Sequence, residues 1–193
     1  MKVIILAGGL GTRISEYTKT IPKPMIKINK IPLICHIMEH YKKFGFNEFY
    51  IAAGYKGKVI KDYFKKSSNK IKIIDTGKNT MTGGRIKRLK KYLKNETFLV
   101  TYGDGISNVN IDKLIKYHRK NKKLVTLTAV RPQARFGALK IKNGKVLYFK
   151  EKSKLILDLV VACGRAILMR LRCFLYAKPH RSRPTRSAPL VER

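Results

Sequence analysis

Acidic side chains are scarce in this sequence: 11 Asp and Glu residues stand against 44 Lys and Arg residues, which gives a formal net charge of +33 over 193 residues. A charge of this size requires a polyanionic partner to be considered. The lysines are nevertheless spread over the polar faces of predicted helices, as in "KRLKKYLK" and "YHRKNKK", rather than gathered in one block. This distribution favours solvated surface charge and no specific nucleic-acid partner. A nonenzymatic basic protein that binds nucleic acid remains the alternative function.

Cysteine is also rare, with Cys35, Cys163 and Cys173 as the complete set. They lack the paired spacing of metal ligands, and their odd number argues against a disulfide framework. Long apolar runs are missing as well, because "LILDLVVACGRAILM" is interrupted by Asp158 and Arg165, so no membrane span is predicted. The apolar start "VIILAGGLG" is too short for a signal peptide. We therefore expect a cytoplasmic protein.

Only four histidines occur, and two of them fall in "HIMEH", residues 36–40, which matches the zinc-hydrolase pattern H-x-x-E-H. His36 and His40 would lie one turn apart on a helix. No third ligand stands at a suitable distance in the sequence. Because Ile34 and Ile37 add apolar residues at helical spacing, the segment indicates an amphipathic helix, and zinc hydrolysis is the weaker interpretation.

Short apolar runs recur over the first 130 residues, and several are apolar throughout, as strands buried on both faces of a parallel sheet are. The predicted strands are Val3–Leu6, Phe49–Ala53, Ile71–Asp75, Phe98–Tyr102 and Leu124–Val130. The stretches between them place apolar residues three and four positions apart, which is typical of amphipathic helices. The predicted helices are Pro32–Phe44, Val59–Lys66, Arg85–Leu93 and Ile111–Asn121.

The alternation of strands and helices predicts an α/β fold: a Rossmann-like, mostly parallel sheet with helices on both faces. Beyond Pro132 the pattern changes to "ALKIKNGKVLYFK", two alternating strands around Asn143–Gly144. A dipeptide of this type between alternating strands is a strong hairpin signal. A β-hairpin is therefore expected in addition to the sheet.

Three glycines and an arginine follow the first predicted strand, in "LAGGLGTR" at residues 6–13. Ligands of open α/β sheets bind at the carboxyl ends of the strands, where glycines let backbone N–H groups approach phosphate oxygens and an arginine adds forked donors. The stretch is not a dinucleotide fingerprint, because Ile14 stands where glycine or alanine is needed, and the chain contains no G-x-x-x-x-G-K-[ST] motif. A turn without a ligand remains the alternative.

Five motifs in order, "GGLGTR", "PKPM", "DTGKNTMTGGR", "TYGDG" and "RFGAL", resemble the glucose-1-phosphate cytidylyltransferase branch of the sugar-1-phosphate nucleotidyltransferases. The resemblance runs from residue 1 to about residue 152 and implies a truncated nucleotidyltransferase fold. It implies transfer of a cytidylyl group from CTP to glucose 1-phosphate with Mg²⁺, giving CDP-glucose and pyrophosphate for nucleotide-sugar, O-antigen and lipopolysaccharide biosynthesis. A homo-oligomer is compatible with it. The segment between Tyr63 and Asp75 is shorter than in the family.

The resemblance also implies the site residues. The stretch that would wrap the triphosphate comprises Leu6, Ala7, Gly8, Gly9, Leu10, Gly11, Thr12 and Arg13, with Arg13 on the departing pyrophosphate. Thr80, Arg85 and Gly103 would complete the nucleotide site. The catalytic residues would be Arg13, Lys23 and Asp104, and Asp104 would hold the metal.

Two of these residues are also favoured by their local sequence. Lys23 stands between Pro22 and Pro24 in a stiff segment, although one more surface lysine is the alternative interpretation. Asp104 follows an apolar strand, which suits a carboxylate that holds Mg²⁺ against phosphate oxygens. An ordinary Gly-Asp-Gly turn is the alternative for Asp104.

Composition changes after residue 154, because residues 155–193 contain seven arginines and one lysine and end in "KPHRSRPTRSAPLVER". We therefore divide the chain into an incomplete nucleotidyltransferase domain, residues 1–154, and an atypical Arg/Pro-rich segment, residues 155–193. A frameshift, a chimeric junction or an appended segment would produce an aberrant, poorly ordered end of this kind, and a basic tail that binds acidic surfaces is the alternative. Since the family's sugar-binding half and second metal-binding aspartate would lie there, we expect little turnover from this chain.

Overall fold

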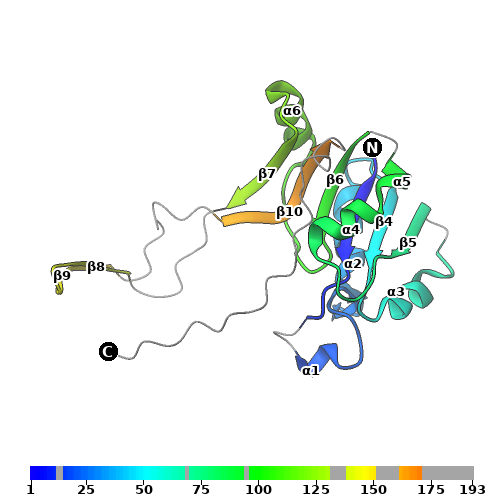
Figure 1. Ribbon diagram of the computed structural model, residues 1–193, viewed down its shortest axis with the longest axis horizontal. Coiled ribbons are helices and arrows are strands. Elements are labelled where there is room, and N and C mark those ends of the chain that lie inside the picture. The colour runs from blue at the N-terminus through cyan, green and yellow to red at the C-terminus, as the bar shows by residue number, and fades with distance from the viewer. Residues whose placement is uncertain (12–14, 68–69, 94–95, 131–137, 151–160, 171–193) are drawn as a thin grey trace.

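A six-stranded sheet is the centre of the fold in the computed structural model, which describes residues 1–11, 15–67, 70–93, 96–130, 138–150 and 161–170 (Figure 1). The strands lie in the order β5-β4-β1-β6-β10-β7. Their bounds are β1 (Val3–Ala7), β4 (Glu48–Ala53), β5 (Lys70–Asp75), β6 (Thr97–Tyr102), β7 (Val125–Val130) and β10 (Val161–Arg170). Every strand predicted for the sheet is therefore present, with bounds that differ by one residue or agree.

Four of the six strands run parallel, since β1 pairs in parallel with β4 and β6, and β4 pairs in parallel with β5. The mostly parallel α/β sheet predicted from the sequence is thus confirmed. Strand β10 was not predicted and pairs antiparallel with both β6 and β7. It falls in residues 155–193, most of which lie outside the described residues, so their separation as an atypical segment stays a prediction.

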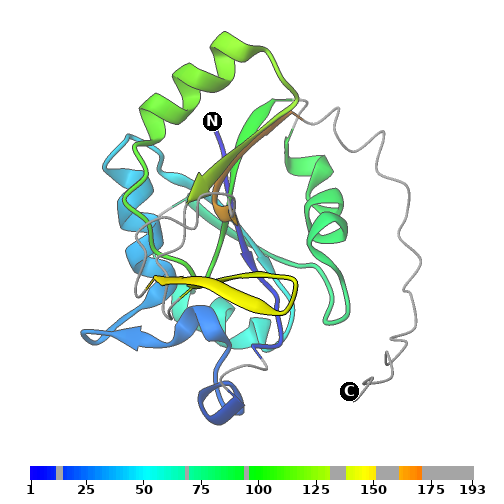
Figure 2. The same cartoon turned by 90° about the vertical axis from the view of Figure 1, so that its left-hand side faces the viewer.

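Helices cover both faces of the sheet, as predicted (Figure 2). Along β1, Val3 and Ile5 point to one face, where α2, α3 and α6 pack, while Ile4 and Leu6 point to the face covered by α4 and α5. This alternation explains why the strand is apolar throughout. The helices are α1 (Ser15–Thr18), the short 3₁₀ turn η2 (Lys23–Met25), α2 (Leu33–Lys42), α3 (Gly57–Phe64), α4 (Thr82–Arg88), α5 (Lys90–Leu93) and α6 (Ile111–Asn121).

Local chemistry sets the helix ends. Helix α6 begins where the Asn110 side chain accepts a hydrogen bond from the amide of Lys113 at 2.9 Å, which satisfies one free donor of the first turn. The single helix predicted over residues 85–93 is two helices, because the Leu89 amide bonds the Ile86 carbonyl, one residue short of the α-helical partner. None of the helices in the described ranges is long and apolar enough to cross a membrane.

In the described part of the chain, two hairpins lie outside the central sheet. The predicted one is confirmed, with β8 (Ala138–Lys142) and β9 (Lys145–Lys150) joined by Asn143 and Gly144, both at positive φ. The second joins β2 (Lys27–Ile28) to β3 (Ile31–Pro32) through Asn29 and Lys30, at φ of 49° and 65°. Sequence patterns missed it because the second turn position, where glycine is typical, holds a lysine.

Replacing Lys30 with glycine is expected to raise the free energy of unfolding by about 0.5–1 kcal/mol, because a left-handed backbone is costly for a residue that carries a Cβ. Urea unfolding would measure the change. The matched control is Lys116→Gly on the exposed face of α6, where glycine should instead lower stability by about 1 kcal/mol. Equal losses for both variants would contradict the turn assignment.

Candidate functional site

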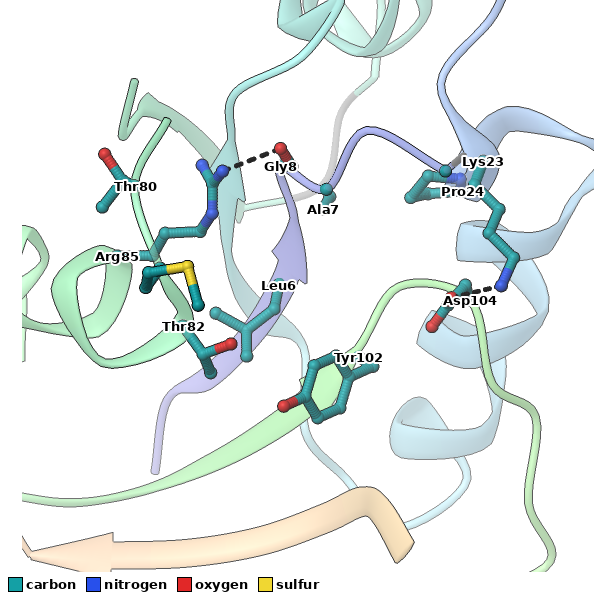
Figure 3. A pocket seen from close by; sticks show the side chains of 13 residues that line it. Leu6, Ala7, Gly8, Lys23, Pro24, Thr80, Thr82, Arg85, Tyr102 and Asp104 are labelled. Atoms are coloured by element: carbon teal, nitrogen blue, oxygen red, sulfur yellow. Dashed lines mark hydrogen bonds and ion pairs between the residues drawn. The ribbon is translucent and has the colours of Figure 1, made fainter. Parts of the chain in front are cut away.

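A cavity of about 320 Å³ opens beyond the carboxyl ends of β1 and β6, next to the residues that follow β5 (Figure 3). Strand β1 has β4 on one side and β6 on the other. The chain therefore adds β4 and β5 on one side of β1 and then crosses to add β6 on the other side, so the strand order reverses at β1. The crevice at such a reversal is the usual ligand site of an open α/β sheet. Of the predicted site residues, those that line the cavity are Leu6, Ala7, Gly8, Gly9, Gly11, Lys23, Thr80, Arg85 and Asp104.

The remaining predicted residues are placed differently. Leu10 is 44% exposed and does not line the cavity. Gly103 does not line it either: its amide donates to the Leu6 carbonyl at 2.9 Å, and a Cβ there would lie 3.0 Å from Pro24. Gly103 therefore allows β6 to end close against η2. Thr12 and Arg13 lie outside the described residues, so their proposed contacts stay predictions.

Arg85 joins three loops at this edge of the sheet. It is 5% exposed, and its guanidinium donates to acceptors in the residues that follow or end β1, β4 and β5. Nη2 donates to the carbonyls of Gly8 and Lys78, at 2.8 and 3.2 Å. Nη1 donates to the Ala53 carbonyl, the Thr76 hydroxyl and the Gly77 carbonyl, at 3.3, 2.7 and 2.8 Å. Both terminal nitrogens are thus bonded to the protein itself, so Arg85 fixes the loops that line the cavity.

Two glycines make room for this guanidinium. A Cβ on Gly8 would lie 2.0 Å from Nη1 of Arg85, and a Cβ on Gly54 would lie 2.4 Å from the same atom. Neither glycine has a positive φ, so each is needed for space and not for backbone conformation. Burial lowers the pKa of Arg85, the nearby Arg88 cation lowers it further and the Asp75 carboxylate raises it, yet the group stays charged at neutral pH.

Lys23 and Asp104 meet on the opposite side of the end of β1 from Arg85 (Figure 3). The Lys23 Nζ lies 2.5 Å from Oδ2 of Asp104, although the two residues are 81 positions apart in the sequence. Extended Pro22 and buried Pro24 hold the 3₁₀ turn that carries the lysine. Both side chains are about one third exposed, so each can reach a ligand in the cavity.

A divalent metal fits this site only if the protein and a bound substrate hold it together. Among the described residues no group of three His, Cys, Asp or Glu side chains could hold an ion, and Asp104 supplies the carboxylate of the cavity. Mg²⁺ is commonly bound through one or two carboxylates together with the phosphates of a substrate. Asp104 can provide the protein part of that arrangement once Lys23 releases it.

The two histidines of the zinc-like pattern are used within the fold. Nε2 of His36 lies 3.0 Å from the Ile28 carbonyl, and Nε2 of His40 lies 2.9 Å from the Val109 carbonyl. A ring nitrogen that faces a carbonyl oxygen carries the proton and donates it, so Nε2 of each histidine is used within the fold, and no group of three metal-ligating side chains occurs in the described part of the chain. The helical interpretation of this segment is confirmed.

The cavity also contains residues that sequence patterns did not single out: Pro24, Met81, Thr82 and Tyr102. Tyr102 ends β6 two residues before Asp104, and its position inside "TYGDG" was the available signal. Met81 is 81% exposed, which is unusual for a large apolar side chain that sits at a cavity rim. These residues add apolar and hydroxyl-bearing side chains to the lining of the cavity, beside its charged groups.

The fold is that of an open α/β protein, with a cavity at the carboxyl ends of its parallel strands. The Nucleotidyl transferase family matches residues 2–163, and the chain belongs to this family. A glucose-1-phosphate cytidylyltransferase of Salmonella typhimurium is 44% identical over 179 residues, covering 80% of this chain and 70% of that protein. A probable glucose-1-phosphate cytidylyltransferase of Bacillus subtilis is 39% identical over 176 residues, covering 79% and 69%.

Solved structures agree on the fold. The structure of HddC from Yersinia pseudotuberculosis complexed with GMP-PN has a TM-score of 0.68 and 27% sequence identity, and covers 93% of this chain and 80% of that one. The comparisons do not favour the alternative of a nucleic-acid-binding protein.

Proposed function

We propose that this protein transfers a cytidylyl group from CTP to glucose 1-phosphate, forming CDP-glucose and pyrophosphate. The observation that carries the proposal is the Lys23–Asp104 pair, at 2.5 Å, beside a glycine-rich turn at the reversal point of the sheet. A cation and a carboxylate at one cavity suit a reaction between two anionic substrates that needs a metal. The substrates follow from the cytidylyltransferases that are 44% and 39% identical.

In the proposed reaction a phosphate oxygen of glucose 1-phosphate attacks the α-phosphorus of CTP. The new P–O bond forms as the bond between the α-phosphorus and the oxygen that bridges it to the β-phosphorus breaks. Pyrophosphate leaves with the electron pair of that bond. Backbone donors of Gly8, Gly9 and Gly11 would bind the phosphates, while Lys23 would neutralise charge at the reacting centre. Arg13, by resemblance, would stabilise the pyrophosphate.

Mg²⁺ is part of the proposal, since nucleotidyltransferases generally use a divalent metal. When bound, it would neutralise phosphate charge. Asp104 would hold it, Lys23 would turn from the carboxylate toward the phosphates, and Thr80 would contact the nucleotide. The cytoplasmic setting, the possible homo-oligomer and the role in O-antigen and lipopolysaccharide synthesis belong to the same proposal.

Calorimetric titration with CTP, UTP, ATP and GTP in the presence of Mg²⁺ tests the nucleotide preference. We expect CTP to bind at least about tenfold more tightly than the others, because one or two hydrogen bonds to the base edge are worth about 1–3 kcal/mol when the wrong base leaves them unmade. Lys23→Ala should weaken binding of all four, whereas Lys116→Ala on remote helix α6 should change none. Equal affinities for the four nucleotides would remove the cytidylyl assignment.

A further inference from the structure

Tyr55 touches both ends of the chain segment that begins at the glycine-rich turn. It lies just after β4, and its amide donates to the Gly8 carbonyl at 3.3 Å. Its phenolic hydroxyl donates to the carbonyl of Thr18, the last residue of α1, at 3.1 Å. Gly8 and Thr18 are ten positions apart in the chain, so Tyr55 bridges two separate points of this segment. Tyr55 itself does not line the cavity.

The Thr18 end of this connection leads back to the cavity. The Thr18 hydroxyl donates to the Gly11 carbonyl at 3.2 Å, and Thr18 is buried. Gly11 has a φ of +68°, and a Cβ on it would lie 2.7 Å from the methyl carbon of Thr18. Because Gly11 lines the cavity, the position of Thr18 sets the position of a backbone segment that faces the ligand.

Neighbouring lysines fix the tyrosine ring. The ammonium groups of Lys56 and Lys78 lie 5.3 and 6.0 Å from the centre of the Tyr55 ring, within the range of cation–π attraction. Lys56 also donates to the carbonyl of Lys19, the residue after Thr18. The phenol therefore has a defined direction, and the α1 end is bonded to two successive residues of the turn after β4.

We propose that Tyr55 is a positioning residue for the glycine-rich turn, holding Gly8 and Gly11 in place to receive the polyphosphate of the nucleotide. This inference rests on the proposed function. A turn that is ordered before the ligand arrives avoids paying the ordering cost during binding, so its anchors act on affinity without touching the ligand. Tyr55→Phe removes one hydroxyl and leaves the ring, and it isolates the contact with Thr18.

The test compares wild type, Tyr55→Phe and the control Tyr63→Phe by calorimetry with CTP–Mg²⁺ and with inorganic tripolyphosphate. Tyr63 is a fair control, because its hydroxyl accepts a hydrogen bond from Cys35 of α2 and the residue does not line the cavity. For Tyr55→Phe we expect both ligands to bind about three- to tenfold more weakly, as one hydrogen bond predicts. The melting temperature should stay within about 2 °C of wild type, since the turn can loosen without global unfolding.

The amide NMR signals of Gly9 and Gly11 should also move in Tyr55→Phe and not in Tyr63→Phe. Unchanged affinities and unchanged glycine signals in Tyr55→Phe would overturn the proposal, and so would equal losses in the two variants. If Tyr55→Phe fails to fold, Lys56→Met removes the adjacent bond to Lys19 and should give the same selective loss. Wild-type protein that binds tripolyphosphate but shows no preference for CTP would overturn the proposed function, while the tripolyphosphate comparison would still decide the role of Tyr55.

Discussion

Replacing Arg85 with methionine is expected to lower the free energy of unfolding by about 3–5 kcal/mol, a large part of the 5–15 kcal/mol typical of a domain. The substitution removes the donor that three loops share, and it leaves the carbonyls of Gly8 and Gly77 without that partner in a half-buried site. Urea unfolding would measure the loss. Arg119→Met, on the exposed face of α6, should change stability by less than about 0.5 kcal/mol.

A second substitution makes this test sharper. Gly8→Ala in the wild type is expected to cost about 2–4 kcal/mol, because the added methyl would occupy the space of the Arg85 guanidinium. In the Arg85→Met background the flexible methionine can move aside, so the same change should cost less than about 1 kcal/mol. Additive costs in the double variant would contradict the close packing of Gly8 on Arg85.

Asp104→Asn is expected to abolish most of the gain in CTP affinity that Mg²⁺ provides. The ratio of the affinities with and without Mg²⁺ should fall by a factor of about ten or more. The amide keeps the shape of the side chain and loses the charge that a hard divalent cation requires. Without metal, the substitution should not weaken CTP binding. Lys23, no longer paired with a carboxylate at 2.5 Å, becomes available to the nucleotide, so the variant should bind CTP as tightly as the wild type or slightly more tightly.

Calorimetry with CTP in Mg²⁺ and in a chelator gives the two affinities whose ratio is needed. Asp112→Asn on helix α6 is the matched control, since it makes the same chemical change on an exposed residue outside the cavity. An unchanged ratio in Asp104→Asn would assign this aspartate to an ordinary turn and would leave the metal to be held elsewhere.

Local patterns were sufficient for the parallel part of the sheet. Strand β1 and residues 49–53 of β4 are buried on both faces, so their sequences are largely apolar and easy to recognise. Strand β10 could not be predicted this way, because its place between β6 and β7 depends on pairing with residues 30 or more positions away. The β2–β3 turn escaped recognition because a lysine occupies a position that glycine usually takes.

For the candidate site, sequence patterns identified which residues gather but not what each one contacts. Lys23 and Asp104 were assigned separately, and only the fold brings their charged atoms to 2.5 Å. Arg85 was expected to contact the nucleotide, which stays a prediction, while its observed partners are carbonyls supplied by loops far apart in the sequence. No local pattern reports such partners, since they depend on the path of the backbone in three dimensions.

The place of β10 has a consequence for synthesis on the ribosome. Strands β5, β4, β1 and β6 are complete at Tyr102 and form a contiguous block, whereas the strand that pairs with the free side of β6 begins about 60 residues later, at Val161. At about 5–20 residues per second, the emerging chain carries an open β6 edge for roughly 3–12 s. Once β7 is complete at Val130, it too lacks a described strand to pair with until β10 emerges, so the nascent chain is most vulnerable to wrong pairing, and most dependent on chaperones, just before its final described strand emerges.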